Sequence, residues 1–192
     1  AAKPEMTKMD SVAGDGDCGL TLKDGANGVL KALKEGKVSG EDVVGSVIAI
    51  SKVAEEAMGG TSGAFYSYVI FSALAQGLAD TSTLATADIW SNALNAVLDR
   101  LDTYTRARPP SRTLVDLLAA FTEALPSGLE VAVNAAKETA EKISDLEAKA
   151  RRNACVEGRR FRAERIPDSS TWDIKVVIDA LIRRFKVMKC CT

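Results

Sequence analysis

Hydrophobic residues recur every three to four positions along most of this chain, the spacing that places them on one face of an α-helix. Alternating patterns of the kind that strands show are few. The periodicity predicts helices at residues 20–33, 41–58, 62–79, 86–105, 112–125, 128–150 and 172–188. Because these segments are longer than the loops between them, the pattern predicts an all-α fold, a bundle of helices.

Local signals mark several helix ends. Ser39 and Asp42 have the spacing of a capping box ahead of the second predicted helix. Thr86 is the expected N-cap of the fourth, and Gly36 is a plausible end of the first. The third predicted helix is apolar on nearly all sides, which indicates a central, buried helix.

Composition narrows the class of protein. The 192 residues are 46% hydrophobic with a net charge of −1, which predicts one globular domain over residues 1–192. No apolar run approaches the roughly 20 residues of a membrane helix, so we expect no membrane association. Four cysteines without CxxC or disulfide-rich spacing favour reduced thiols and a cytoplasmic location.

The chain contains no histidine. This removes the commonest general base, the usual zinc ligand and every Ser-His or Cys-His nucleophile arrangement. Residues 149–165 are rich in arginine, with Phe161 as the sole aromatic side chain. Because single-stranded nucleic acids are bound through aromatic stacking as well as charge, we interpret most of this segment as a solvated basic loop and expect no nucleic-acid partner.

The segment MDSVAGDGDCGLT, residues 9–21, concentrates carboxylates and glycines. Asp10, Asp15 and Asp17 are candidates to converge on a cation, because the glycines between them allow sharp turns. Oxygen ligands of this kind suit Mg²⁺ with room for a diphosphate, whereas the EF-hand pattern for calcium is missing. The alternative is a turn in which the aspartates cap helices or bond their own backbone.

Two further segments precede predicted helices. AMGGTSGAF, residues 57–65, offers backbone N–H groups and the hydroxyls of Thr61 and Ser62 to an anion. The alternative is that its glycines permit close helix packing while Thr61 is a simple N-cap. TRARPPSRTLVD, residues 105–116, surrounds a proline bend with arginines, which suits either phosphate recognition or ordinary surface charge.

The order GDGDCG, GGTSGA and ARPPSRTLVD resembles the C-terminal nucleotide-binding domain of the dihydroxyacetone kinase family, which includes fungal single-chain enzymes, bacterial kinase subunits and animal triokinase/FMN cyclase. The resemblance covers nearly the whole chain, is specific from Asp10 to Asp116 and weakens after about Glu147. It implies an antiparallel barrel of eight α-helices with ATP or ADP held across one end. The chain begins AAKPEM, where the family's first helix would be ending, so we expect a processed or truncated end and a shortened first helix.

The resemblance also implies site residues. Asp10, Asp15 and Asp17 match the aspartates that bind two Mg²⁺ ions bridging the nucleotide phosphates. The other matching positions line the nucleotide, and they are Cys18, Gly19, Leu20, Thr21, Thr61, Ser62, Thr105, Arg112, Thr113, Leu114, Arg152, Asp168, Ser169 and Ser170. Around Arg152 the family's GRASY has become RRNAC, and at Asp168 its DPG turn has become DSS.

In the family, dihydroxyacetone is held by a separate domain through a histidine, and this chain contains neither. The leading hypothesis is therefore a Mg-ATP-binding domain of a dihydroxyacetone-kinase-like phosphotransferase that works with a substrate domain or subunit. The altered segments favour an alternative, a stand-alone Mg-dependent lyase or cyclase acting on a diphosphate ester such as FAD or a prenyl diphosphate. A non-catalytic interaction scaffold is the third hypothesis, and a homodimer is left open.

Overall fold

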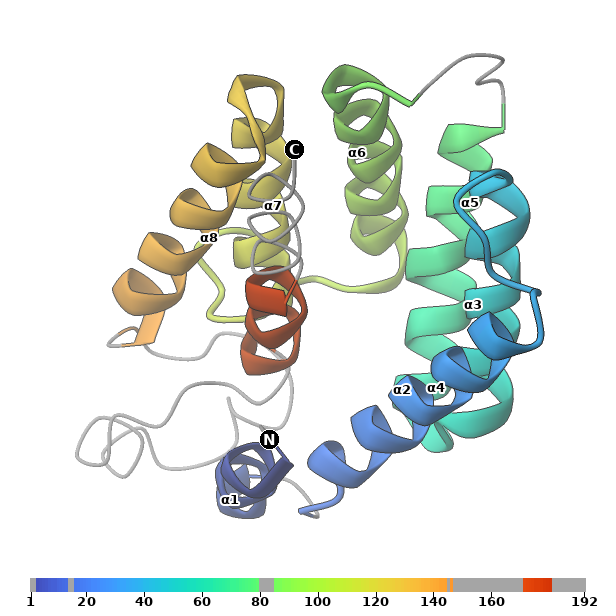
Figure 1. Cartoon of the computed structure of the whole chain (residues 1–192). Coiled ribbons are helices and arrows are strands. Elements are labelled where there is room, and N and C mark those ends of the chain that lie inside the picture. Colours follow the sequence, from blue (N-terminus) through green and yellow to red (C-terminus); the bar gives the residue numbers. More distant parts are fainter. Residues whose placement is uncertain (1–2, 14–15, 80–84, 145, 147–170, 181–192) are drawn as a thin grey trace. The chain divides into compact units, whose positions relative to one another are not determined.

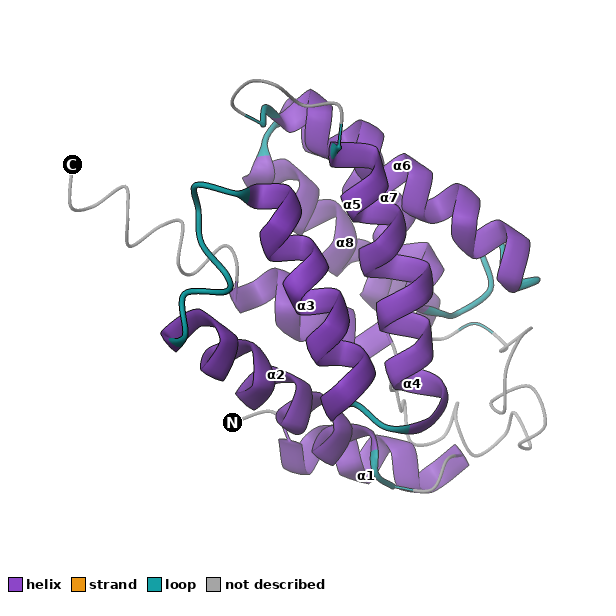
Figure 2. Cartoon of the chain, turned by 90° about the vertical axis from the view of Figure 1, so that its right-hand side faces the viewer, coloured by secondary structure: helices purple, strands orange, loops and turns teal. Residues whose placement is uncertain are grey.

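The computed structural model describes residues 3–13, 16–79, 85–144, 146 and 171–180. Every regular element among these residues is a helix, and they contain no strand (Figure 2). The predicted all-α class is therefore confirmed. No helix in these ranges has both the length and the apolar character that crossing a membrane requires.

Figure 1 shows the helices in their order along the chain. In chain order they are α1 (Lys3–Ala13), α2 (Cys18–Lys34), α3 (Val43–Ala57), α4 (Gly60–Ala64), the π-helix η1 (Phe65–Phe71), α5 (Ser72–Leu78), α6 (Ala87–Tyr104), α7 (Leu114–Ala124), the 3₁₀-helix η2 (Leu125–Ser127) and α8 (Leu129–Ser144). Residues 171–180 are helical as well.

The chain forms two compact units. The first comprises residues 1–16 and 106–192, and the second comprises residues 17–105. The chain passes from one unit to the other between Gly16 and Asp17 and again between Thr105 and Arg106. The single domain over residues 1–192 stays a prediction.

In the second unit, α2 packs closely against α3 because glycines face it. A Cβ atom on Gly25 would lie 2.6 Å from the Sδ atom of Met58, and one on Gly28 would lie 2.5 Å from Cγ1 of Val53. The two pairs run in opposite order along the helices, so α2 and α3 are antiparallel. A larger residue at Gly28 would press against the stiff, branched side chain of Val53, and one at Gly25 would displace the side chain of Met58.

The segments α4, η1 and α5 form one continuous helix, interrupted in its middle by π-helical turns. The hydroxyl of Ser51 on α3 donates to the backbone carbonyl of Ser67 in η1 at 3.0 Å. Val69 and Ile70 are buried, whereas Tyr68 is exposed. The expected central helix is thus buried on most of its faces, with one side open to solvent.

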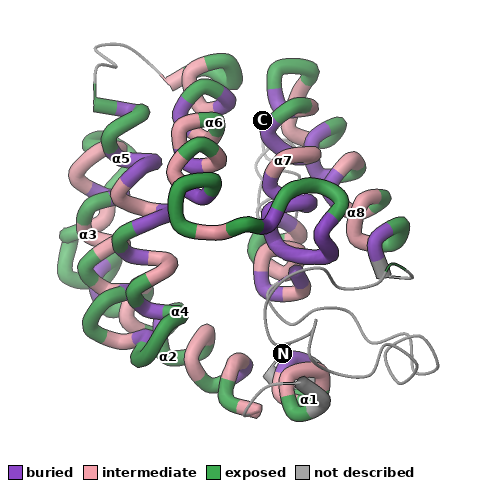
Figure 3. The backbone as a smooth tube through the Cα atoms, turned by 180° about the vertical axis from the view of Figure 1, so that it is seen from behind, coloured by how far each residue is buried: buried purple, intermediate pink, exposed green. Residues whose placement is uncertain are grey.

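Helix α6 completes the second unit against α5. A Cβ on Gly77 would lie 2.7 Å from Cα of Ala93, which shows how closely the two backbones approach. Val97 and Leu101 on α6 are fully buried, and buried and exposed residues alternate around the helix as its amphipathic sequence predicts (Figure 3).

In the first unit, α7 and α8 form a helical hairpin joined by η2 and Gly128, whose φ is +120°. Leu117 on α7 and Val133 on α8 are fully buried. Lys137 on α8 forms an ion pair with Asp179 of the helical stretch 171–180, with Nζ and Oδ1 2.8 Å apart. This ion pair connects the helical residues 171–180 with α8.

The predicted capping box that begins at Ser39 is wrong. The N-cap of α3 is Asp42, whose side chain accepts a hydrogen bond from the Gly45 amide at 2.7 Å. Ser39 supports the preceding turn, since its hydroxyl oxygen accepts from the Asp42 amide at 3.4 Å. The N-cap at Thr86 is confirmed, because its side chain accepts from the amide of Ile89.

Candidate functional site

The aspartate loop begins in the last turn of α1, which carries Asp10. The chain then turns back, and the backbone amide of Gly16 donates to Oδ2 of Asp10 at 3.0 Å. Gly16 has a φ of +78°, a left-handed conformation that glycine adopts without steric cost. Both residues belong to the first unit. For Asp10 this bond agrees with the sequence alternative in which an aspartate bonds the backbone of its own loop. Asp15 lies outside the described residues.

Helix α2 begins directly after Asp17, in the second unit. The backbone carbonyl of Asp17 accepts from the amides of Leu20 and Thr21 at 2.8 and 3.0 Å and closes the first turn. The Asp17 side chain is exposed and makes no capping hydrogen bond. The sequence alternative in which this aspartate caps the helix is therefore wrong for Asp17.

The other predicted contacts at the start of α2 differ in exposure. Leu20 is exposed, Cys18 and Thr21 are half-buried, and Gly19 is buried. An exposed carboxylate followed by accessible side chains in the first turn of a helix gives a ligand access to this end of α2.

A magnesium site stays a prediction. In the parts of the chain that the structure describes, no three side chains of His, Cys, Asp or Glu lie close enough together to hold a metal ion. Asp10 and Asp17 belong to different units, and Asp15 is outside the description. The chemistry of the donor set nevertheless fits magnesium, because exposed and half-buried carboxylates are the ligands this ion takes beside phosphate oxygens.

The Gly-Gly-Thr-Ser segment starts the long helix of the second unit. Gly59 is the N-cap and Gly60 has a φ of +65°. Thr61 and Ser62 are both exposed in the first turn of α4. The alternative that Thr61 is a simple N-cap is wrong, and its hydroxyl is accessible to a ligand.

The arginine-rich bend, residues 105–116, has an exposed first part and a buried second part. Arg106 and Arg108 are exposed, and Nη1 of Arg108 donates to the carbonyl of Ala107 at 2.8 Å. Ser111 to Thr113 are buried, with Arg112 only 3% exposed. The peptide bond between Pro109 and Pro110 is cis.

Arg112 adopts a left-handed backbone conformation with a φ of +60°. This is uncommon for a residue with a side chain and costs about 1–2 kcal/mol relative to ordinary conformations. Such residues persist only where the surrounding structure holds them in place, and they cluster at functional sites. Among the predicted site residues that the structure describes, Arg112 is therefore distinguished by a strained backbone.

The residues beside Arg112 are held by Asp116, in the first turn of α7. Thr113 is the N-cap and forms a capping box with Asp116. The sequence reasoning selected Thr113 but missed Ser111 and Asp116. The signal was present, since Thr-x-x-Asp ahead of an apolar run is the spacing of a capping box.

Leu114 is buried in the first turn of α7, and Thr105 is half-buried where α6 ends. These two residues belong to different units. Arg152, Asp168, Ser169 and Ser170, the remaining predicted contacts, lie outside the described residues.

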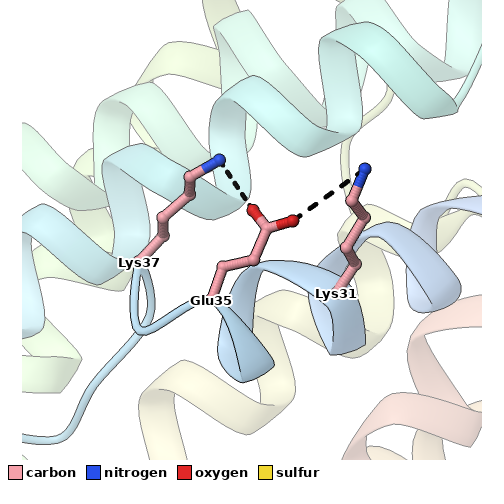
Figure 4. A network of polar contacts seen from close by, with 3 residues as sticks. All are labelled: Lys31, Glu35 and Lys37. Atoms are coloured by element: carbon pink, nitrogen blue, oxygen red, sulfur yellow. Dashed lines mark ion pairs between the residues drawn. The ribbon is translucent and has the colours of Figure 1, made fainter.

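The far end of α2 carries a charged cluster that is separate from the candidate site. Glu35 pairs with Lys37 at 2.7 Å and with Lys31 at 3.9 Å (Figure 4). The hydrogen bond and charge of Lys37 lower the pKa of Glu35, and the same contact raises the pKa of Lys37. These exposed pairs lie a whole 17-residue helix, about 25 Å, from Asp17. They are ordinary surface ion pairs, which contribute little to stability.

The fold and these segments define an all-helical domain with an aspartate–glycine loop, a Gly-Gly-Thr-Ser helix start and an arginine bend. The family model described as the DAK2 domain matches residues 12–183. The chain belongs to this family.

Similar proteins are much longer than this chain. It is 40% identical over 190 residues to a dihydroxyacetone kinase of Komagataella pastoris, covering 93% of this chain and 31% of that protein. It is 38% identical over 187 residues to dihydroxyacetone kinase 2 of Saccharomyces cerevisiae, covering 94% and 32%. It is 30% identical over 187 residues to human triokinase/FMN cyclase, covering 92% and 31%. The chain thus spans about a third of the length of these relatives.

Proposed function

We propose that this chain is the magnesium-nucleotide-binding domain of a dihydroxyacetone-kinase-like phosphotransferase. The observation that supports this most directly is membership of the DAK2 domain family, since the family's relatives include proteins named dihydroxyacetone kinase. The exposed position of Asp17 at the start of α2 adds to this, because it leaves the side chain accessible to a metal ion.

In this proposal Asp10, Asp15 and Asp17 hold Mg²⁺, two ions by resemblance to the family. The metal would neutralise charge on the phosphates of bound ATP. The chain's own residues position the nucleotide, and phosphoryl transfer then needs little covalent chemistry from the protein. This agrees with the absence of histidine from the sequence.

The exposed hydroxyls of Thr61 and Ser62 are suited to donate hydrogen bonds to phosphate oxygens. The first turn of α2, from Cys18 to Thr21, contacts the nucleotide beside the metal. By resemblance to the family, Thr105 and Leu114 border the adenine, and Arg112 and Thr113 match the family's Arg-Thr pair in the nucleotide site. Arg152, Asp168, Ser169 and Ser170 complete the base side of the site.

The phosphoryl acceptor in this proposal is a small ketose such as dihydroxyacetone, held by a separate domain or subunit. The relatives named dihydroxyacetone kinase are about three times as long as this chain, which leaves room for such a domain. We propose a cytoplasmic location with no nucleic-acid or membrane partner. A homodimer is compatible with the proposal and is not required by it.

A second candidate function is a magnesium-dependent lyase or cyclase acting on a diphosphate ester. The observation that favours it is the similarity to human triokinase/FMN cyclase, whose name includes a cyclisation. In that case the same aspartates and metal ions would stabilise a departing phosphate group. The third hypothesis, a non-catalytic scaffold, predicts no ligand at all.

Thermal unfolding separates these functions. The chain is melted with Mg²⁺ and ADP, ATP, pyrophosphate or farnesyl diphosphate, each against an EDTA control. A ligand that binds only the folded state stabilises it by about 2.7 kcal/mol at a hundred times its dissociation constant. Greater stabilisation by nucleotide than by pyrophosphate supports the kinase domain, and the reverse supports the second candidate. No stabilisation by any of them contradicts both.

Catalysis needs a second experiment. The chain is mixed with a separately expressed dihydroxyacetone-binding domain, ATP and Mg²⁺, and triose phosphate is measured. Formation that depends on both proteins supports the kinase function. If nucleotide binds but no triose phosphate forms, the acceptor or the partner domain is wrong while the nucleotide site stands.

A further inference from the structure

The backbone of Arg112 has a conformation that is unusual for an arginine. Its φ is +60°, a left-handed conformation that glycine and, to a lesser extent, asparagine adopt at little energetic cost. The position is occupied by arginine, and that arginine is only 3% exposed. A strained backbone that carries a long charged side chain inward indicates that this side chain is needed at one defined place.

The carboxylate of Asp116 stabilises the backbone around this strained residue. Asp116 accepts hydrogen bonds from the residues on both sides of Arg112. The amide of Ser111 donates to Oδ1 at 2.9 Å, and the amide of Thr113 donates to Oδ2 at 2.7 Å. The hydroxyl of Ser111 adds a third bond, to Oδ2 at 3.1 Å.

This arrangement goes beyond an ordinary capping box. A capping box needs only the bonds between Thr113 and Asp116, whereas here the carboxylate also binds the backbone two residues earlier. Because Ser111, Thr113 and Asp116 are at most 3% exposed, solvent does not compete for these bonds. The peptide unit that follows Arg112 and the one that precedes Ser111 are thereby fixed to the same carboxylate, and the left-handed conformation of Arg112 lies between these two anchored amides.

We propose that Asp116 is a positioning residue of the nucleotide site, acting through Arg112. This inference rests on the proposed function, in which Arg112 and Thr113 contribute to nucleotide binding. Asp116 does not contact the ligand itself. It sets the direction in which the Arg112 side chain leaves the backbone.

Substitution of Asp116 by asparagine tests the proposal. In Asp116→Asn one acceptor oxygen is replaced by an amide donor, which must face an N–H or O–H group. We expect affinity for Mg-ADP, measured calorimetrically well below the melting temperature, to fall at least about tenfold, as on losing one charge-assisted hydrogen bond. Asp88→Asn is the matched control, since Asp88 is an exposed acid in the first turn of α6. It should leave the affinity unchanged.

A double-mutant cycle distinguishes positioning from general support of the fold. In an Arg112→Ala background, Asp116→Asn should weaken Mg-ADP binding no further, although it still lowers the melting temperature. An equal loss of affinity in both backgrounds would overturn the inference. The ¹³C chemical shifts of the Arg112 backbone provide a readout without ligand, and they should leave the left-handed range in Asp116→Asn.

A milder variant covers the case in which Asp116→Asn does not fold. Ser111→Ala removes only the hydroxyl donor and keeps both backbone bonds, so a smaller loss of affinity is expected, and unchanged affinity would overturn the inference. Failure of the wild-type chain to bind Mg-ADP would refute the proposed function, and the inference with it. Wild-type binding with unaltered affinity in the variants would refute the inference alone.

Discussion

Gly63 and the carbonyl oxygen of Met58 are so close that a Cβ atom on Gly63 would lie 1.8 Å from that oxygen. No side chain fits there unless the backbone moves. The contact joins the end of α3 to the first turn of α4, where Thr61 and Ser62 are exposed. Gly63 is thus required by the sharp connection that presents these two hydroxyls.

We expect Gly63→Ala to destabilise the chain by about 1–3 kcal/mol, the usual cost of overpacking. This would occur although alanine is the better helix former by about 1 kcal/mol. Chemical denaturation measures the free energy of unfolding. Gly40→Ala is the control, because a Cβ on Gly40 meets no atom within 4 Å. Equal stability of the two variants would show that the connection is looser than described.

Much of the fold was predictable from the sequence. The periodicity of apolar residues located the helices because each must bury one face. The bounds of α6 differ from the predicted segment by one residue at each end, and Thr86 caps it as expected. The cap of α3 was misplaced because Ser39 and Asp42 both have capping side chains, and only the backbone geometry decides between them.

Other structural features could not be predicted from the sequence. The π-helical turns of η1 have the same apolar composition as an α-helix, so the pattern of residue types does not reveal them. The left-handed conformation of Arg112 was unpredictable because arginine rarely adopts it. Asp116 carried a recognisable capping spacing, but its bond to the Ser111 amide depends on a turn that the sequence alone does not specify. The magnesium ligands stay a prediction drawn from residue type and resemblance.

Ser51 supports the π-helical turns. Its hydroxyl donates to the Ser67 carbonyl at 3.0 Å, and Ser67 is only 2% exposed. Ser51→Ala should lower the free energy of unfolding by about 1 kcal/mol, the typical net value of one hydrogen bond. Lys52→Ala alters the neighbouring exposed residue and should change stability by less than about 0.5 kcal/mol. If the two variants are equally stable, the bond contributes nothing.

Tyr68 should titrate at higher pH than a free tyrosine. Its hydroxyl donates to Oε1 of Glu55, and this hydrogen bond, together with the charge of Glu55, raises the pKa of Tyr68 above 10.0. Because the folded-state pKa is the higher one, the contact stabilises the fold fully below pH 10, and this contribution is lost as the pH rises through the folded-state pKa.

The ionisation of Tyr68 is measurable by ultraviolet absorbance, as the difference from a Tyr68→Phe variant. Glu55→Gln should shift this ionisation to lower pH, because the charged acceptor is removed. Glu56→Gln removes a neighbouring exposed carboxylate and should not shift it comparably. Identical titrations for Glu55→Gln and the wild type would contradict the hydrogen bond.

The core of the second unit is expected to be sensitive to truncation. Leu101 on α6 is fully buried, whereas Leu30 on α2 is 54% exposed. Leu101→Ala should destabilise the chain by about 2–5 kcal/mol through lost burial and the remaining cavity. Leu30→Ala should cost much less, because its side chain already contacts water. Denaturant titration of both variants gives the comparison, and similar losses would place Leu101 outside the core.

The central claim is that the aspartate loop binds nucleotide through magnesium. Calorimetric titration of ADP with and without Mg²⁺, in wild-type, Asp17→Asn and Asp24→Asn chains, tests it most directly. Asp24 is the matched control, an exposed carboxylate on the same helix. We predict Mg²⁺-dependent binding in the wild type and Asp24→Asn and its loss in Asp17→Asn. Binding of equal strength in Asp17→Asn, or binding that needs no Mg²⁺, would contradict the claim.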